Sequence, residues 1–157
     1  MIPPTDLESA IQRLQADYWA RVDYVDRAPA EDLFTADSAF ELGSLVLRGR
    51  AELAEFFRRR QEANAAAGRI TRHLSTNLRL SPVDSQTVAV STTVLVMTGY
   101  GPLPVAATTP SIGDFEDVCV LTNGVWLFHR RKATSVFAGP DAPAFARGNQ
   151  PQGDRPE

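Results

Sequence analysis

The first part of the chain is patterned for a helix. Apolar residues recur at spacings of three and four from Leu7 to Val25, the period of one face of an α-helix. Pro29 interrupts the helical hydrogen-bond ladder, and it can also open a short helix through residues 30–34. The pattern therefore predicts a long amphipathic helix up to Pro29 and a short one after it.

A strand pair and a second long helix are predicted next. After a reversal at residues 35–37, residues 38–47 are rich in Phe, Leu and Val around Gly43, which is typical of two strands joined by a turn. Beyond Gly49, the apolar residues Leu53, Phe56 and Phe57 mark the inward face of a helix.

This second helix also carries three consecutive arginines, at residues 58–60. Glu52, Glu55 and Glu62 surround them at helical spacing. A solvated, internally paired helix face therefore explains the run better than a phosphate-binding site does.

After Gly68 the apolar period changes from helical to alternating, which is typical of strands. Strands are predicted at about 69–81, 87–98, 112–122 and 125–137, and Asn123-Gly124 is a strong hairpin signal between the last two. Helices followed by a run of strands predict an α+β fold, with a mainly antiparallel sheet packed on the N-terminal helices.

Two segments fall outside this pattern. Residues 99–110 contain too many prolines for a central strand, and their length suits a lid or an oligomer contact. Gly, Pro and polar residues dominate from Gly139 onward. We expect one domain over residues 1–138 and a flexible tail over residues 139–157.

Composition narrows the function. The net charge is only −3, which gives no reason to expect nucleic acid or a membrane surface as a partner. No apolar run approaches the roughly 18 residues of a membrane span, and the N-terminus lacks a signal-peptide pattern. The single cysteine, Cys119, rules out an internal disulfide framework. These features predict a cytoplasmic protein.

The predicted strand 69–81 has one apolar face and one polar face. The polar face can be solvated, or it can line a pocket. The apolar face combines Ile70, Leu74, Leu78 and Leu80 with Arg72 and Thr76, whereas the polar face consists of Thr71, His73, Ser75, Asn77 and Arg79.

Three motifs, VDR at 25–27, TRHLSTNLRL at 71–80 and NGVWLF at 123–128, carry a resemblance to a known superfamily. The chain resembles SnoaL-like members of the nuclear-transport-factor-like, or ketosteroid-isomerase-like, superfamily, with motifs similar to those of scytalone dehydratase and hexachlorocyclohexane dehydrochlorinase. The resemblance implies a cone-shaped barrel with a deep central pocket.

The resemblance also implies a catalytic pair. In those two enzymes, a histidine at the place of His73 is the general base, and an aspartate at the place of Asp26 orients it. Imidazole can accept a proton near neutral pH, and a carboxylate on its other nitrogen fixes the tautomer. Asp23 competes for the orienting role, but its spacing of four residues from Arg27 favours a surface ion pair. Such a pair needs no metal or cofactor.

Further residues are candidates for binding a substrate. Arg21 stands where the dehydrochlorinase has a basic residue that assists the departing anion. The full set of substrate-binding candidates is Tyr18, Trp19, Arg21, Tyr24, Asn77 and Tyr100. The chain departs from the dehydratase at Met97 and Thr98, where a second histidine is missing, and from the dehydrochlorinase at Leu121 and Thr122, where an arginine is missing. Arg130 or Arg131 could replace that arginine, although a basic strand end is usually solvated.

We therefore predict a cofactor-independent lyase or isomerase, similar to a dehydratase or dehydrohalogenase, that acts on a small hydrophobic cyclic or oxygenated molecule. The alternatives are a non-catalytic ligand-binding or assembly protein, and a polyketide cyclase or hydroxylase. If the polar face of strand 69–81 lines the pocket, Leu74 and Leu78 lie on the outer face, so a homo-oligomer, a dimer or trimer, is expected.

Overall fold

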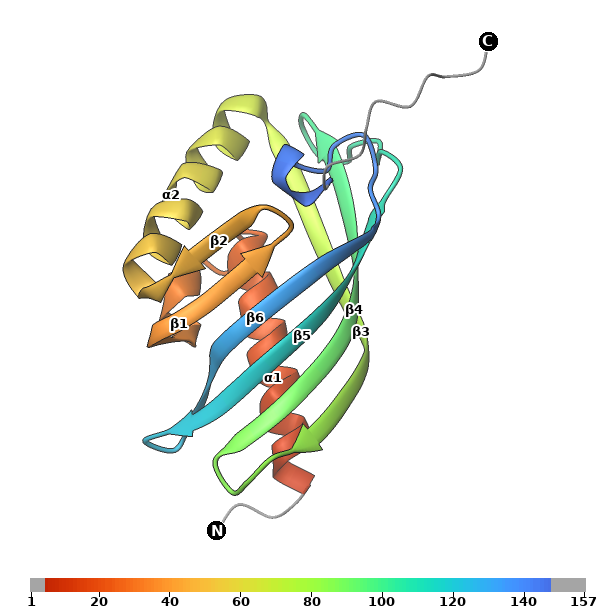
Figure 1. Cartoon of the computed structure of the whole chain (residues 1–157). Coiled ribbons are helices and arrows are strands. Elements are labelled where there is room, and N and C mark those ends of the chain that lie inside the picture. Colours follow the sequence, from red (N-terminus) through yellow and green to blue (C-terminus); the bar gives the residue numbers. More distant parts are fainter. Residues whose placement is uncertain (1–4, 148–157) are drawn as a thin grey trace.

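The computed structural model describes residues 5–147 as a curved sheet with two long helices on its concave side (Figure 1). Helix α1 spans Thr5–Val22 and crosses the sheet, while α2 spans Gly49–Ala67 and lies at one side of it. Short 3-10 helices, η1 at Ala30–Leu33 and η2 at Ala144–Ala146, complete the helical elements of this part of the chain. The predicted α+β, cone-shaped architecture is confirmed.

The sheet has the strand order β2-β1-β6-β5-β4-β3. Strand β1 pairs with β6 in parallel, and every other neighbouring pair is antiparallel. The strands are β1 Phe34–Leu42, β2 Leu45–Arg48, β3 Arg69–Pro82, β4 Thr87–Tyr100, β5 Ser111–Thr122 and β6 Val125–Phe137. All four long strands predicted after Gly68 are present, within two residues at each end.

Helix α1 ends earlier than its apolar pattern predicts. The amide of Asp23 still donates to the carbonyl of Trp19, but Tyr24 adopts a left-handed backbone with φ +58°. The amides of Val25 and Asp26 then both donate to the carbonyl of Ala20, which closes the helix end. Asp23 is therefore the last side chain that projects from the helix, and Asp26 lies beyond the reversal.

The reversal predicted at residues 35–37 is wrong, because β1 already begins at Phe34. Phe34 is fully buried, it pairs with Phe128 of β6, and the two rings lie 5.2 Å apart. Packing of this aromatic pair holds the segment in the sheet, although its polar residues are typical of a turn.

Strand β3 changes face in its middle. Thr76 pairs with Thr93 and Arg79 with Ser91, so β3 carries one extra residue, at a bulge where Asn77 has φ +56°. Before the bulge Leu74 is 55% exposed; after it Leu78 packs against the core. The expectation that Leu74 and Leu78 share the outer face is therefore wrong for Leu78.

Residues 139–147, which the sequence places in a flexible tail, fold back over one end of the sheet (Figure 1). The Gly139 amide donates to Ser111 Oγ at 2.9 Å, and the Ser44 amide, in the β1–β2 turn, donates to the Phe145 carbonyl at 3.1 Å. Ala146 is buried. This segment is thus part of the domain as far as the structure describes it, and residues 148–157 lie outside the described range.

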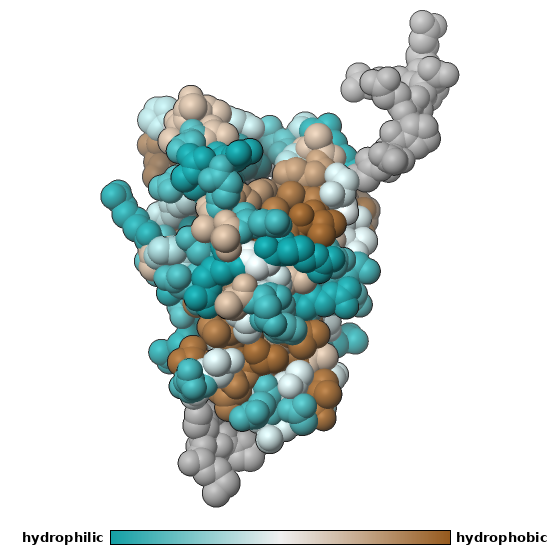
Figure 2. All heavy atoms as spheres, turned by 60° about the vertical axis from the view of Figure 1, so that its left-hand side comes forward, coloured by the Kyte–Doolittle hydropathy of each residue, from teal (hydrophilic) through white to brown (hydrophobic). Residues whose placement is uncertain are grey.

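The opposite end of the molecule carries exposed apolar residues. Figure 2 shows hydrophilic residues across much of one face, with hydrophobic residues gathered in two areas, at its lower end and at its upper right. Val83 and Val125, beside the β3–β4 and β5–β6 turns at the lower end of Figure 1, are both more than half exposed. No helix in the described range is long and apolar enough to cross a membrane.

Candidate active site

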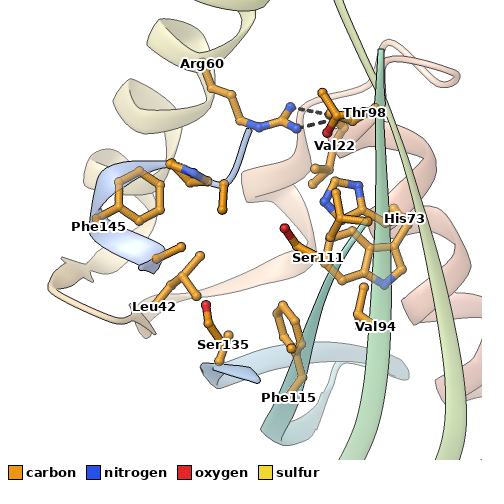
Figure 3. Close-up of a pocket in the computed structure, with 18 of the residues that line it drawn as sticks. Val22, Leu42, Arg60, His73, Val94, Thr98, Ser111, Phe115, Ser135 and Phe145 are labelled. Carbon is orange, nitrogen blue, oxygen red and sulfur yellow. Dashed lines mark hydrogen bonds between the residues drawn. The ribbon is translucent and has the colours of Figure 1, made fainter. Parts of the chain in front are cut away.

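A cavity of about 150 Å³ lies between the helices and the concave face of the sheet. Its walls are mainly apolar and aromatic, with contributions from both helices, five of the strands and the segment 139–147 (Figure 3). The polar residues among those that line it are Arg60, Arg69, Thr71, His73, Thr98, Ser111, Ser135 and Asp141. A concave apolar site with a few polar groups is the usual form of a small-molecule site.

His73 and Asp23 form the central polar contact at this cavity. The distance from Nδ1 of His73 to Oδ1 of Asp23 is 2.6 Å, and the His73 amide donates to Oδ2 of Asp23 at 2.7 Å. Thr71 donates its hydroxyl to the same Oδ1 at 2.7 Å. Three hydrogen bonds therefore fix the Asp23 carboxylate, whose side chain is only 3% exposed.

Burial sets the charge state of this pair. It lowers the pKa of His73, and the Asp23 carboxylate offsets that effect only in part. Burial alone would raise the pKa of Asp23, but the hydrogen bonds and charge interaction with His73, with the bond from Thr71, hold it below its usual value. Near pH 7 a neutral imidazole thus donates from Nδ1 to an ionised carboxylate, which leaves Nε2 free to accept a proton.

The indole ring of Trp19 stacks on the face of the His73 imidazole. The indole and imidazole rings stack with centroids 4.3 Å apart and planes 9° apart. Trp19 lies one helical turn before Asp23, which directly follows α1, so the two side chains contact the His73 ring from adjacent positions. His73 is therefore fixed both in its plane and at one nitrogen.

The predicted role of Asp26 as the orienting carboxylate is wrong. Its Oδ1 accepts a hydrogen bond from the amide of Ala28, and its Oδ2 lies 3.6 Å from Nε of Arg21, on the surface. In a helix that continued past Val22, Asp26 would lie seven residues after Trp19, on the face that carries Asp23. The reversal at Tyr24 removes Asp26 from that face. The surface ion pair predicted between Asp23 and Arg27 does not form either.

The six predicted substrate-binding residues divide into two groups. Tyr18 and Trp19 line the cavity, where burial raises the pKa of the Tyr18 hydroxyl. The other four lie elsewhere: Arg21 and Tyr24 border a separate surface hollow, Asn77 is exposed at the β3 bulge, and Tyr100 donates its hydroxyl to Asp141 at 2.8 Å.

A buried ion pair supports Tyr18 and Trp19. Arg131, which is 0% exposed, donates to both oxygens of Asp117 at 3.0 Å and to Oε1 of Gln15 at 2.6 Å. Its guanidinium carbon lies 4.3 Å and 5.1 Å from the ring centres of Tyr18 and Trp19. The prediction of a solvated strand end is thus wrong for Arg131, because its side chain turns inward beneath the aromatic rings.

Arg60 also reaches the cavity, although the sequence pattern placed it on a solvated face. Only Arg58 and Arg59 follow that prediction, through ion pairs with Glu55 and Glu62. Arg60 follows the buried Phe57 by three residues, on the inward face of α2. That spacing was the signal in the sequence that could have separated Arg60 from its two neighbours.

Residues 5–147 contain no group of three or more His, Cys, Asp or Glu side chains that could hold a metal ion. The polar groups at the cavity are the His73–Asp23 pair, several hydroxyl groups, the guanidinium groups of Arg60 and Arg69, and the Asp141 carboxylate.

Solved structures show the same fold. A candidate scytalone dehydratase from Novosphingobium aromaticivorans is 22% identical with a TM-score of 0.74, over 99% of this chain and 100% of that one. ActVI-ORFA from Streptomyces coelicolor is 22% identical with a TM-score of 0.75, over 87% and 100%. The β subunit of a candidate aromatic-ring-hydroxylating dioxygenase from N. aromaticivorans is 17% identical with a TM-score of 0.69, over 83% and 90%.

Curated protein sequences gave no significant match. The family comparison is more decisive, because the profile of the SnoaL-like domain matches residues 4–132, from the start of α1 into β6. The chain belongs to the SnoaL-like domain family.

Proposed function

We propose that the protein is a cofactor-independent lyase or isomerase in which His73 removes a proton from carbon and Asp23 orients the imidazole. The observation that carries this proposal is the 2.6 Å contact between His73 Nδ1 and Asp23 Oδ1 at the wall of an apolar cavity. A neutral histidine beside a buried carboxylate has the geometry and the charge state of a general base.

The proton balance of the step is simple. Nε2 of His73 takes the proton, and the electron pair of the broken C–H bond forms a new double bond. If a leaving group on the next carbon departs with its bonding pair, the result is elimination. If the next carbon is instead a carbonyl carbon, its π pair moves to the oxygen; when the carbonyl re-forms and the proton returns to another carbon of the conjugated system, the result is isomerisation. Asp23 stabilises the imidazolium that forms, because its carboxylate already accepts the Nδ1 hydrogen.

Cavity size and fold neighbours support a small cyclic substrate. A volume of about 150 Å³ is roughly the room that one six-membered ring needs. Among the neighbours, one is named as a candidate scytalone dehydratase and another as a candidate aromatic ring hydroxylase. We therefore propose a substrate with one ring and a carbon acid next to a carbonyl group.

Hydrogen exchange in D₂O tests this proposal without knowledge of the true substrate. Acetophenone and cyclohexanone carry enolisable C–H bonds, and their conversion to C–D is measured by proton NMR with and without protein. We expect the wild type to accelerate exchange, His73→Gln to abolish the acceleration, and Asp26→Asn, a matched control on the surface, to retain it. If ketones that bind the cavity exchange no faster than in buffer, the general-base proposal is wrong.

The main alternative is a non-catalytic binding or assembly protein. Its support is the dioxygenase β subunit among the fold neighbours and the exposed Leu74 on the outer face of the sheet. Binding of a ketone without exchange favours this alternative. A polyketide cyclase would use the same pair on a longer chain, which exchange alone does not distinguish. The dimer or trimer stays a prediction that sedimentation equilibrium tests.

A further inference from the structure

The side chain of Arg60 extends from α2 into the wall of the cavity that holds His73 (Figure 3). Its Nη1 donates to the carbonyl of Val22 at 2.6 Å and to the hydroxyl of Tyr24 at 3.3 Å. Its Nη2 donates to the hydroxyl of Thr71 at 3.2 Å. All three acceptors are uncharged oxygen atoms, and they come from the end of α1 and from β3.

Arg60 lacks a direct counterion. Among residues 5–147, no carboxylate lies within 4.0 Å of its guanidinium, whereas the neighbouring Arg58 and Arg59 both pair with glutamates. Yet Arg58 and Arg59 are exposed and Arg60 is partly buried. A cation that leaves water without an anionic partner is unfavourable. Neutral hydrogen bonds and the Tyr24 ring, whose centre is 5.6 Å from the guanidinium carbon, hold Arg60 in place without neutralising its charge. An anionic or polar ligand group would supply the missing partner.

Asp23, the nearest acidic residue in this hydrogen-bond chain, cannot serve as that partner. His73 and Thr71 occupy its Oδ1, and the amide of His73 occupies its Oδ2. Thr71 links the two charges, since its hydroxyl accepts from Arg60 and donates to Asp23. The chain Arg60–Thr71–Asp23–His73 fixes the base and the cation relative to one another.

The guanidinium keeps donors for a ligand. Arginine has five N–H groups, and the three hydrogen bonds described use two on Nη1 and one on Nη2. One N–H on Nη2 and the N–H on Nε remain, on the edge that can bind an oxygen in the planar, bidentate manner typical of arginine.

We infer that Arg60 binds the carbonyl or carboxylate oxygen of the ligand, so that the ligand is a one-ring molecule with such an oxygen at one edge. Its role in a reaction rests on the proposed function. As His73 Nε2 takes the proton from the carbon beside the carbonyl, the C–H electron pair becomes a C=C bond. The carbonyl π electrons then move to the oxygen, where Arg60 stabilises the negative charge.

Arg69 is the other cation at the cavity, and its contacts serve a different purpose. It donates to Oδ1 of Asn64 and to the backbone carbonyl of Asp141, both at 3.3 Å, and so attaches the segment 139–147 to β3. Tyr100 holds the carboxylate of the same Asp141. Arg69 is therefore the matched control for Arg60, with the same charge at the same cavity.

Binding of benzoate and of its neutral isostere benzamide tests the inference by calorimetry at pH 7.5. We expect the wild type and Arg69→Met to bind benzoate at least about tenfold more tightly than benzamide, because a charged acceptor strengthens the bond to arginine. In Arg60→Met this preference should fall below about twofold, because benzoate loses a charged hydrogen bond whereas benzamide loses only the weaker bond to its neutral carbonyl. Circular dichroism and urea unfolding show whether the variant is folded.

An unchanged benzoate preference in Arg60→Met overturns the inference, and so does a wild type without any preference. If the benzoate preference is lost in Arg69→Met and kept in Arg60→Met, Arg69 binds the ligand oxygen, and this result also overturns the inference. Benzoate has no enolisable C–H bond, so this result is independent of proton transfer. His73→Gln should keep the benzoate preference, which separates a failure of Arg60 as the anchor from a failure of His73 as the base.

Discussion

Asp23 and His73 are 50 residues apart in the chain, yet they are joined by two hydrogen bonds, from the imidazole and from the backbone amide of the same histidine. Through the second bond, Asp23 binds the backbone of β3 at His73 as well as the His73 side chain. The backbone of β3 therefore fixes the position of the carboxylate, and the carboxylate in turn orients the imidazole ring of His73.

A pair of isosteric variants separates the two candidate carboxylates. Asp23→Asn removes the negative charge of the carboxylate that accepts the His73 hydrogen bond, and this charged acceptor raises the pKa of His73 against the effect of burial. We therefore expect this variant to lower the pKa of His73 by about one unit or more. Asp26→Asn should leave it unchanged, because Asp26 lies on the surface with Arg21. Titration of the His73 ring by NMR measures both; equal effects of the two variants would contradict the assignment.

The free energy of unfolding should decrease as pH falls below about 6.5, because His73 is protonated less readily in the folded protein than in the unfolded chain. The folded-state pKa of His73 lies below its unfolded value, so the unfolded chain takes up the proton first as pH falls below about 6.5. The stabilisation is thus present at high pH and lost as pH decreases toward the folded-state value. Asp23, whose pKa is also lowered, adds a further loss only below about pH 4.

The measurement is urea unfolding of the wild type and of His73→Gln at pH 8 and pH 5. Glutamine does not titrate, so we expect the stability difference, wild type minus variant, to shrink by about 1 kcal/mol at pH 5. Groups remote from His73, including Asp117, cancel in this comparison. Asp23 does not cancel, but it changes the difference in the same direction, because without His73 its folded-state pKa rises and the variant is stabilised as pH falls. A difference that grows at pH 5 would mean that the folded-state pKa of His73 is raised instead of lowered.

The buried pair of Arg131 and Asp117 should be costly to break. Arg131→Met leaves the Asp117 carboxylate buried without its cation, and removal of one partner from such a pair typically costs about 3–5 kcal/mol. The matched control is Arg130→Met, because the Arg130 side chain is half exposed and its one ion pair is long, with 3.9 Å between Nη2 and Oε2 of Glu41. This substitution should change the free energy of unfolding by no more than about 0.5 kcal/mol. Chemical denaturation provides both values, and equal values would place Arg131 in a solvated position.

The turn at Gly43 should be sensitive to a single methyl group. A Cβ built on Gly43 would collide with the carbonyl oxygen of Phe145, and the residue has φ +57°. Gly124 is a control with φ +80° and open space around its Cβ position. Both alanine variants should lose about 1–2 kcal/mol from the left-handed backbone, and Gly43→Ala should lose more.

Hydrogen exchange locates the additional loss. The amide of Ser44 donates to Phe145, so its exchange should accelerate in Gly43→Ala and not in Gly124→Ala. If the two variants behave alike, residues 139–147 do not pack against the β1–β2 turn in solution.

Periodicity was sufficient for most of the fold. Alternation identified all four long strands, and Asn123 and Gly124 identified the last hairpin, because such signals are local. The end of α1 and the β3 bulge were missed, because Tyr24 and Asn77 adopt positive φ without a glycine to indicate it. The first of these features ends α1, and it decides which aspartate contacts His73.

The candidate site was predicted only in part for the same reason. His73, Tyr18 and Trp19 line the cavity. Periodicity placed Tyr18 on the apolar face of its helix, whereas His73 was singled out by the family resemblance. Arg60 was assigned to solvent because glutamates surround its arginine run at helical spacing, and Arg131 because a basic strand end is usually solvated. The rings and hydroxyl groups that these two side chains contact come from other elements of the fold. Composition predicts the average environment of a residue type, and functional residues depart from it.

The cavity is enclosed by residues from both ends of the described chain, from Tyr18 in α1 to Phe145 beside η2. During synthesis on a ribosome, the helices and the sheet can therefore assemble before the last wall of the cavity has been made. A stop codon or proteolytic cut between residues 139 and 145 would leave a largely complete domain with an open pocket. Ligand affinity is then a more sensitive report of an intact C-terminal segment than secondary-structure content is.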